Sequence, residues 1–211
     1  MRTTLRLAAL VAGSVVAGSL VAGAAPSVAQ AAERGEAIFA GGCFWCMETA
    51  FEGQPGVKAA ISGYDGGPKK DPTYEEVSGG STGHAESVRV VYDPQKTSYA
   101  KLLEIFWHNV DPFSGGGQFC DRGNQYRPAI FFLDETQKKA AEESKRAVEA
   151  QLKQKVAVEI VAATPFYAAE EYHQDFYKKS PGRYYSYRSG CGRDRRLEQV
   201  WGAAAGKSAV H

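Results

Sequence analysis

The sequence has little of the features that identify a binding scaffold or a fibrous protein. Of its 211 residues only four are cysteine and four are histidine, and its 25 basic residues are nearly balanced by 24 acidic ones. So few cysteines exclude a disulfide-dense scaffold, and a net charge of +1 gives no field that would draw the chain onto nucleic acid. With 44% hydrophobic and 23% charged residues, the composition is that of a globular protein, neither disordered nor collagen-like.

Long apolar runs are also absent, except at the start of the chain. Two arginines precede an apolar stretch over residues 7–25, and residues 26–31 end in a small-x-small pattern. This pattern is typical of a secretory signal peptide, cleaved after Ala31, and a retained membrane anchor is the alternative.

Residues 32–211 contain no repeat or linker, so we expect one domain with its core at about 36–201. After signal cleavage we expect it to be exported, periplasmic or secreted, monomeric and without stable membrane association. Export places the cysteines where oxidation is permitted, so thiol chemistry there requires an external source of electrons.

Hydrophobic periodicity predicts alternating strands and helices. The predicted strands cover residues 36–40, 57–63, 86–92, 129–133 and 156–161, and the predicted helices cover 43–51, 98–110, 134–154 and 167–179. Asp134, with Gln137 three residues later, predicts a capping box at the start of the third helix. The Arg- and Tyr-rich residues after 182 are expected to wrap the surface as coil. Alternating elements favour an α/β domain with helices packed on a sheet.

The sharpest cluster of reactive residues is the sequence GGCFWC at 41–46. The two glycines permit a tight turn, and Cys43 then stands at the start of a predicted helix. Free N–H groups and the positive end of the helix dipole meet there, and both favour a thiolate. We therefore interpret Cys43 as a reactive thiol rather than an inert buried cysteine.

The other three cysteines each permit two interpretations. Cys46 completes a C-x-x-C pattern with Cys43, and residues three apart in a helix can reach disulfide distance. Either Cys43 and Cys46 form a redox-active pair, or Cys46 only packs beneath the first turn of the helix. Cys120 and Cys191 lie in glycine-rich stretches, where mobility suits a resolving cysteine, and Cys191 is the preferred candidate. A structural bridge between Cys120 and Cys191 is the alternative.

Glu86 is anomalous because it begins an alternating strand and shares a face with Val88, Val90 and Tyr92. A carboxyl group buried on that apolar face loses hydration, so its pKa rises and it can act as a general acid near pH 7. The alternative is a strand-end glutamate that reaches solvent or pairs with an arginine. The alternation alone does not decide between these two placements.

The histidines give weaker signals. His84 is either a base beside Cys43 or, preferably, a turn residue with local hydrogen bonds, whereas His108 and His173 are expected to be structural or exposed. Cysteine and histidine spacing does not match a zinc site, so we expect no metal. The aromatic candidates for lining a pocket are Phe44, Trp45, Tyr64, Tyr74 and Tyr126, of which the last two lie in polar turns.

Six motifs occur in order: GCFW at 42–45, DPTY at 71–74, TGHAE at 82–86, YDP at 92–94, DRGNQYR at 121–127 and AEEYHQ at 169–174. Together they resemble the peptide methionine sulfoxide reductases of the A type (MsrA), over roughly residues 36–201. The resemblance implies a ferredoxin-like, two-layer α/β (α+β) sandwich with a mixed sheet, flanking helices and a long C-terminal coil.

The resemblance also implies reduction of the S epimer of methionine sulfoxide, free or in proteins. By position, it makes Cys43 the nucleophile and Glu86 the acid. It places Tyr74 and Tyr126 at the sulfoxide oxygen, Asp121 in the same polar network, and Phe44 and Trp45 around the substrate methyl group.

In the implied reaction, Cys43 attacks the sulfoxide sulfur while Glu86 protonates the oxygen, and Cys43 is left as a sulfenic acid that a second thiol converts to a disulfide. A thioredoxin-like protein, or dithiothreitol in vitro, then restores the thiols without any tightly bound cofactor. Many members of the family have glycine in place of Cys46 and asparagine in place of Cys120. Cys46, Cys120 and Cys191 therefore all remain candidates for the resolving thiol.

Two other functions fit parts of the sequence. Cys43 and Cys46 alone fit a thioredoxin-like thiol–disulfide oxidoreductase, for which sulfoxides would be irrelevant. A Cys120–Cys191 bridge fits a secreted binding module that is not an enzyme, and this reading requires Cys43 to be unreactive.

Overall fold

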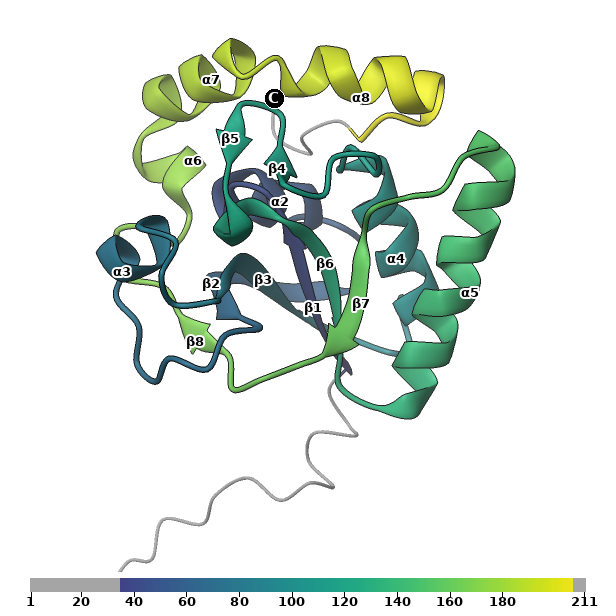
Figure 1. The fold of residues 1–211 in the computed structure, drawn as a ribbon, viewed down its shortest axis with the longest axis horizontal. Helices are drawn as coiled ribbons and strands as arrows, with labels where there is room; N and C mark the ends of the chain where they lie inside the picture. Colours follow the sequence, from purple (N-terminus) through teal and green to yellow (C-terminus); the bar gives the residue numbers. More distant parts are fainter. Residues whose placement is uncertain (1–34, 207–211) are drawn as a thin grey trace, which may run out of the picture.

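The computed structural model describes residues 35–206, in which helices pack on one face of a central sheet (Figure 1). Six strands form this sheet in the order β7-β6-β1-β3-β2-β8, and β4 and β5 form a separate two-stranded ribbon. The sheet is mixed, because β6 and β7 run parallel while the other neighbours run antiparallel. The expected signal segment, residues 1–31, lies outside the described residues.

The strands are β1 (Gly35–Gly41), β2 (Val57–Asp65), β3 (Ala85–Tyr92), β4 (Gly117–Gln118), β5 (Asp121–Arg122), β6 (Pro128–Phe132), β7 (Glu159–Ala162) and β8 (Tyr167–Ala168). The helices are α2 (Phe44–Phe51), α3 (Tyr74–Ser78), α4 (Tyr99–His108), α5 (Glu135–Leu152), α6 (Phe176–Lys179), α7 (Pro181–Gly190) and α8 (Arg193–Trp201), with 3-10 turns at Asn124–Tyr126 and Gly202–Ala204. The five predicted strands are confirmed to within a few residues, and so are the first three predicted helices. Within residues 35–206 no helix has both the length and the apolar character of a membrane span.

With the short α3 and the β4–β5 ribbon treated as insertions, the chain follows the order β1-α2-β2-β3-α4-β6, which is a ferredoxin-like unit with spatial strand order β6-β1-β3-β2. After α5, strand β7 extends the sheet beside β6, and β8 pairs with β2 at the opposite edge. The expected two-layer α/β fold is therefore confirmed.

Alternation along β1 divides the apolar residues between the two faces of the sheet. Ala37 and Phe39 join the main core beneath the helices, whereas Ile38 and Ala40 belong to a smaller cluster on the other face. The Phe39 ring stacks on Phe51 of α2, with 5.1 Å between ring centroids. Burying each such phenylalanine contributes roughly 1.5–3 kcal/mol. This packing fixes α2, and with it the start of that helix, against the middle of the sheet.

The capping interaction at α5 is confirmed only in part. The Asp134 carboxylate accepts a hydrogen bond from the Gln137 backbone N–H at 2.7 Å, as expected for an N-cap. The Gln137 amide, however, accepts from Leu133 N–H and donates to the Glu36 carbonyl, so it ties α5 to β1 instead of completing the box.

The expectation of a helix over 167–179 was wrong. This stretch begins as β8, continues through turns and becomes helical only at α6. The physical reason is competition from the sheet edge, because the Tyr167 backbone pairs with Tyr64 of β2 and the Gln174 side chain bonds both backbone groups of Ser62.

The expectation of a long C-terminal coil was also wrong, because α7 and α8 occupy this stretch and lie across one end of the molecule (Figure 1). In α8 the buried stripe at helical spacing is Arg193, Leu197 and Trp201. An arginine holds the first position of that stripe, so the apolar periodicity that predicts a helix is incomplete here.

Gly42 sets the turn between β1 and α2. Its φ of +82° lies in the left-handed region, and a Cβ there would stand 2.6 Å from the Gln118 Cβ. We predict that Gly42→Ala destabilises the protein by about 2–4 kcal/mol, from backbone strain plus the clash, and displaces Cys43. Urea unfolding and the rate of Cys43 alkylation measure the two effects.

Gly53→Ala is the matched control, since φ is +75° there but nothing lies within 4 Å of the added Cβ. It should cost only about 1 kcal/mol and leave Cys43 alkylation unchanged. Equal losses in the two variants would show that the close approach of Gln118 does not shape the turn.

Candidate active site

Antiparallel pairing of β1 with β3 brings Cys43 and Glu86 together from distant parts of the sequence. The register Phe39↔Val88 places the end of β1 beside the start of β3, and Gly42 then turns the chain into α2. The backbone N–H of Phe44, the first residue of α2, donates a hydrogen bond to Glu86 Oε2 at 3.0 Å. A free N–H group at the start of the helix is thereby satisfied by the carboxyl group of the strand.

The start of α2 opens into a small cavity of about 70 Å³. Eight residues line it: Cys43, Phe44, Trp45, Tyr74, Glu86, Asp121, Tyr126 and Tyr187. The first seven are the catalytic and substrate-binding residues predicted from the sequence, so the structure brings all of them to one place. The eighth, Tyr187, was not predicted, and Tyr64 lies outside the lining, where its hydroxyl donates to Glu170 at 2.8 Å.

The Glu86 side chain is buried on the helix-covered face with Val88 and Val90, which was one of the two placements that the alternation left open. Burial raises the pKa of Glu86 to about 8, although the hydrogen bond from Phe44 opposes the shift. Glu86 forms no ion pair with any residue in the described range. The alternative of a solvated or arginine-paired glutamate is therefore wrong, and the cavity holds a neutral carboxylic acid at pH 7.

The two thiols of α2 behave as one unit. Burial raises the pKa of the Cys43 thiol well above its usual range, and its hydrogen bond with Cys46 raises that pKa further. The same hydrogen bond lowers the pKa of Cys46 to about 6, and the guanidinium groups of Arg193 and Arg188 contribute to the lowering. The directions of the two shifts favour the first negative charge of the pair on Cys46, whereas the sequence analysis expected a thiolate at Cys43.

A fully buried cation stands beneath this pair. Arg193 donates to the Gly41 carbonyl at 3.0 Å and the Asn109 carbonyl at 2.8 Å, and its guanidinium lies 4.3 Å from the centroid of the Phe119 ring. Within residues 35–206 no carboxylate forms an ion pair with it. A buried charge without an ionic partner favours negative charge nearby, and here the Cys46 thiol and the Asp121 carboxyl lie in its field.

Hydroxyl donors face Glu86 across the cavity. Burial raises the pKa of Tyr74 to about 12 and raises the pKa of Tyr126 above its usual value, so both phenols keep their protons. Tyr74 begins α3, where Thr73 and Glu76 form a capping box and Glu170 accepts from the Tyr74 N–H at 2.9 Å. These contacts fix the direction of the Tyr74 side chain.

Tyr187 and Asp121 close the remaining side of the cavity. The Tyr187 hydroxyl donates to Asp121 Oδ2, and the backbone of Cys43 also hydrogen-bonds to Asp121. This contact joins α7 to β5 directly above the thiol. The sequence contained one weak signal for Tyr187, the concentration of tyrosine and arginine after residue 182, but placing it required α7.

His173 aligns the tryptophan of the cavity. The Trp45 indole N–H donates to His173 Nδ1 at 3.1 Å. The face of the indole stacks on the Phe176 ring, with 3.7 Å between centroids. Burial lowers the pKa of His173, so the ring is neutral and able to accept this bond. His84, by contrast, does not line the cavity, so its interpretation as a base beside Cys43 is wrong. Its ring bonds the backbone of Gly67 and Lys69 on another segment, rather than making the local hydrogen bonds expected of a turn residue.

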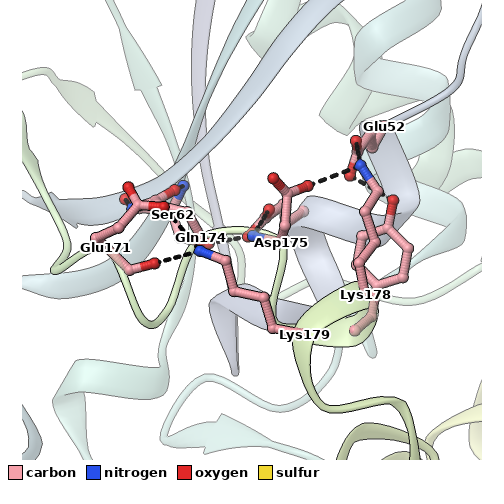
Figure 2. A network of polar contacts seen from close by, with 9 residues as sticks. Glu52, Ser62, Glu171, Gln174, Asp175, Lys178 and Lys179 are labelled. Carbon is pink, nitrogen blue, oxygen red and sulfur yellow. Dashed lines mark hydrogen bonds and ion pairs between the residues drawn. The ribbon is translucent and has the colours of Figure 1, made fainter.

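A network of polar contacts anchors α2 to residues 171–179 (Figure 2). Lys178 pairs with Asp175 and with Glu52, the C-cap residue that follows α2, and Gln174 bonds the backbone of Ser62 in β2. The buried Glu48 carboxylate adds bonds to Ser62 at 2.5 Å and to the Asp175 N–H at 2.6 Å. The segment that carries His173 is therefore held rigidly against the site helix.

The four cysteines divide into an inner and an outer pair. Cys43 and Cys46 are free and buried, whereas Cys120 and Cys191 form a disulfide, which was the alternative considered for them. Cys120 lies next to Asp121, and the Cys191 N–H bonds to the Tyr187 carbonyl at 2.9 Å. The outer disulfide thus joins the same two segments as the Tyr187–Asp121 contact.

Two groups of potential metal ligands occur in residues 35–206. In the first, Cys120 and Cys191 are joined to each other, so they offer no thiolate beside Asp121. In the second, the carboxylates of Glu52 and Asp175 already bind the Lys178 ammonium group. Neither arrangement favours a metal ion.

A polarisable nucleophile, a neutral acid and hydroxyl donors around an aromatic slot define a thiol-dependent redox site. The sequence matches the family model "Peptide methionine sulfoxide reductase" over residues 35–205. MsrA of Bacillus licheniformis is 51% identical over 82% of this chain and 96% of its own length, and MsrA 2 of Caulobacter vibrioides is 52% identical over 79% and 85%.

Solved structures give the same result. Reduced Mxr1 of Saccharomyces cerevisiae has a TM-score of 0.68 and 31% identity, covering 71% of this chain and 87% of that one. Methionine sulfoxide reductase A of Corynebacterium diphtheriae has a TM-score of 0.63 and 31% identity, covering 71% and 76%. The chain belongs to the peptide methionine sulfoxide reductase A family.

Glu86 also makes folding stability depend on pH. The folded protein keeps the Glu86 proton up to about pH 8, whereas the unfolded chain loses it near 4.5. Between these values the folded state binds more protons, so the stabilisation is complete below about 4.5 and is lost as pH rises through 8. In the parent protein the free energy of unfolding should fall by a few kcal/mol between pH 5 and pH 8, since one pKa unit corresponds to about 1.4 kcal/mol. We predict that Glu86→Gln removes this fall.

Urea unfolding at the two pH values measures this difference. Glu104→Gln is the control, because Glu104 is on the exposed side of α4 and its pKa is lowered, so it titrates below this window. A Glu86→Gln variant whose stability still falls as steeply as that of the parent would contradict a neutral carboxyl at this position.

Proposed function

We propose that this protein reduces the S epimer of methionine sulfoxide, in proteins or as the free amino acid, to methionine. The observation that carries the proposal is the shared 70 Å³ cavity, in which the Cys43 thiol and the protonated Glu86 carboxyl lie among three tyrosines and two apolar rings. A sulfoxide presents an electrophilic sulfur, a basic oxygen and an apolar methyl group, and each has a counterpart there. Phe44 and Trp45 suit the methyl group through apolar and sulfur–aromatic contacts.

In the proposed reaction the Cys43 sulfur attacks the sulfoxide sulfur, and its proton passes to the hydrogen-bonded Cys46 thiolate. Glu86 protonates the sulfoxide oxygen, assisted by the hydroxyls of Tyr74 and Tyr126. The new S–S bond then breaks as the hydroxyl transfers to Cys43, which releases methionine and leaves a sulfenic acid. One thiol is oxidised to a sulfenic acid while one sulfoxide is reduced to a thioether.

Cys46 is the resolving thiol in this proposal. It hydrogen-bonds Cys43, whereas Cys120 and Cys191 are bonded to each other. After the first step Cys46 carries the proton taken from Cys43. The Cys46 sulfur attacks the sulfenic acid and its proton joins the departing hydroxyl, so a disulfide forms and water leaves, while Glu86 regains its proton from solvent. A thioredoxin-like protein first reduces the Cys120–Cys191 disulfide to a dithiol, and this dithiol then reduces Cys43–Cys46 by disulfide exchange and returns to its disulfide form.

The neighbourhood of the thiols favours this function over simple thiol–disulfide exchange through Cys43 and Cys46. Disulfide exchange needs only thiolates and a reachable disulfide, so a neutral acid and tyrosine hydroxyls in the same cavity would have no part in it. A binding module with a structural bridge is disfavoured because the bridge leaves Cys43 and Cys46 free.

A sulfoxide-reduction assay on cysteine variants tests the proposal. With methionine sulfoxide and dithiothreitol, Cys43→Ser should be inactive because the nucleophile is lost. In the absence of reductant, Cys46→Ser should still release one methionine per chain and leave a Cys43 sulfenic acid that dimedone labels, because neither the next thiol nor a small thiol is there to reduce it. Glu86→Gln should slow the first turnover at pH 7 by about 10²–10⁴-fold, and the difference should narrow above pH 8, where Glu86 itself loses its proton.

Three outcomes of this assay would change the proposal. Turnover by Cys43→Ser would exclude the proposed function, and an unchanged rate for Glu86→Gln would remove the carboxyl from the acid role. Full thioredoxin-dependent turnover by Cys46→Ser would move the resolving role to Cys120 or Cys191 and leave the sulfoxide chemistry intact.

We further propose that the protein is exported. The basic start, the apolar stretch over residues 7–25 and the small-residue end of residues 26–31 support this placement. N-terminal sequencing of the protein from its native cells should find Ala32 as the first residue. A chain that begins at Met1 in the cytoplasm would contradict the proposal.

A further inference from the structure

The cavity at Cys43 is too small to enclose more than the end of a substrate side chain. Its volume of about 70 Å³ is roughly that of two water molecules in the liquid. A sulfoxide group with its methyl fills such a space, so the rest of an oxidised polypeptide lies outside, on the surface around the mouth of the cavity. That surface therefore influences which oxidised methionines reach Cys43.

Five rings form a continuous aromatic strip at this mouth: Phe176, Trp45, His173, Tyr74 and Tyr172. Trp45 and Tyr74 line the cavity itself. The Phe176 ring lies 3.7 Å from the indole, and the His173 ring lies 4.3 Å from Tyr74 and 4.2 Å from Tyr172, between centroids. Tyr172 is 54% exposed, so it offers its ring to a substrate side chain that stays outside the cavity.

One end of the aromatic strip is negatively charged. Helix α3 contains two glutamates and no basic residue. Glu75, which follows Tyr74 on this helix, is exposed and forms no ion pair with any residue in the range 35–206. Its charge acts on Tyr172 and His173, and so does that of Glu170, whose carboxylate also accepts from the Tyr74 N–H at 2.9 Å. A basic side chain beside Tyr172 would therefore be attracted.

The other end of the strip is positively charged. Helix α7 contains two arginines and no acidic residue, and it stands apart from α3 (Figure 1). Arg188 is paired with Asp194, whereas Arg183 is exposed and has no carboxylate partner in the described part of the chain. The Arg183 guanidinium lies 5.4 Å from the centroid of the Phe176 ring, which connects it to Trp45. An acidic side chain near Trp45 would therefore be attracted to this end.

We propose that the aromatic strip and its two charged ends select oxidised polypeptides in which the methionine sulfoxide has a basic side chain on one flank and an acidic side chain on the other. The basic side chain lies beside Glu75 and Tyr172, and the acidic side chain lies beside Arg183. A segment with the same charge on both flanks gains one attraction and meets one repulsion. This inference rests on the proposed function, because it names the substrate class of the same cavity.

Synthetic peptides with a single methionine sulfoxide test the preference, with dithiothreitol as the reductant. Their flanks carry lysine and glutamate in either order, lysine on both sides, or glutamate on both sides. The better of the two mixed peptides should exceed both like-charged peptides in kcat/KM by about twofold to fivefold, the effect of one exposed ion pair. This advantage should disappear at about 1 M salt, where charges on the surface are screened.

Variants assign each end of the strip. Glu75→Gln should lower kcat/KM for the lysine-flanked peptide about twofold to fivefold, and Arg183→Gln should do the same for the glutamate-flanked peptide. Neither should change the rate with free methionine sulfoxide, which has no flanking residues. Glu142→Gln and Arg146→Gln are the matched controls and should change no rate, because both residues are exposed on α5, far from α3 and α7 (Figure 1).

Equal kcat/KM for all four peptides would overturn the proposed selection, and so would variants that slow free methionine sulfoxide as much as the peptides. Peptide binding to Cys43→Ser, measured by fluorescence anisotropy, tests the surface without turnover and should give the same order of affinities. If the parent protein reduces no sulfoxide but this order is found, the proposed function fails and the surface stands. If it reduces free methionine sulfoxide but binds all four peptides equally, the selection alone fails.

Discussion

The hydrogen bond between the Phe44 backbone and the Glu86 carboxyl, 3.0 Å long, is the contact on which the site depends. It joins the N–H of Phe44, the first residue of α2, to Glu86, the second residue of β3. Because the carboxyl takes this N–H, the helix N-terminus stabilises Glu86 rather than Cys43. Burial opposes ionisation of both groups, so the resting cavity holds an acid and a thiol in their neutral forms.

Negative charge is instead held one turn deeper in α2. Cys46 accepts the hydrogen bond of Cys43 and lies in the field of Arg193, which is buried without a carboxylate partner. A thiolate beneath the nucleophile can take its proton at the moment of attack and can later attack the oxidised sulfur. One cysteine thereby serves two steps of the proposed cycle, and the buried arginine supports both.

Much of the cavity is predictable from the sequence because it is built from local patterns. Cys43 is identified by a double glycine before a helix. The alternation of β3 marks Glu86 as anomalous, and the resemblance to the MsrA family, rather than the alternation, predicts its role as the acid. Tyr187 and Arg193 are not predictable in this way, because their roles depend on where α7 and α8 pack. Arg193 also interrupts the apolar stripe from which α8 would have been predicted. The residue whose positive charge favours a thiolate at Cys46 is therefore also the reason that the sequence did not predict this helix. The pKa order of the two thiols depends first on burial and on the hydrogen bond between them, and then on Arg193 and Arg188 of α8 and α7. It reversed the expectation drawn from the helix dipole.

The central claim is that the carboxyl of Glu86 is protonated beside Cys43 at neutral pH. Infrared difference spectra of protein labelled with ¹³C-carboxyl glutamate, taken across pH and compared with the Glu86→Gln variant, measure this directly. The account predicts that the band of a protonated carboxyl assigned to Glu86 persists at pH 7 and disappears with a midpoint of about 8. A midpoint near 4.5, the ordinary value for glutamate, would contradict it.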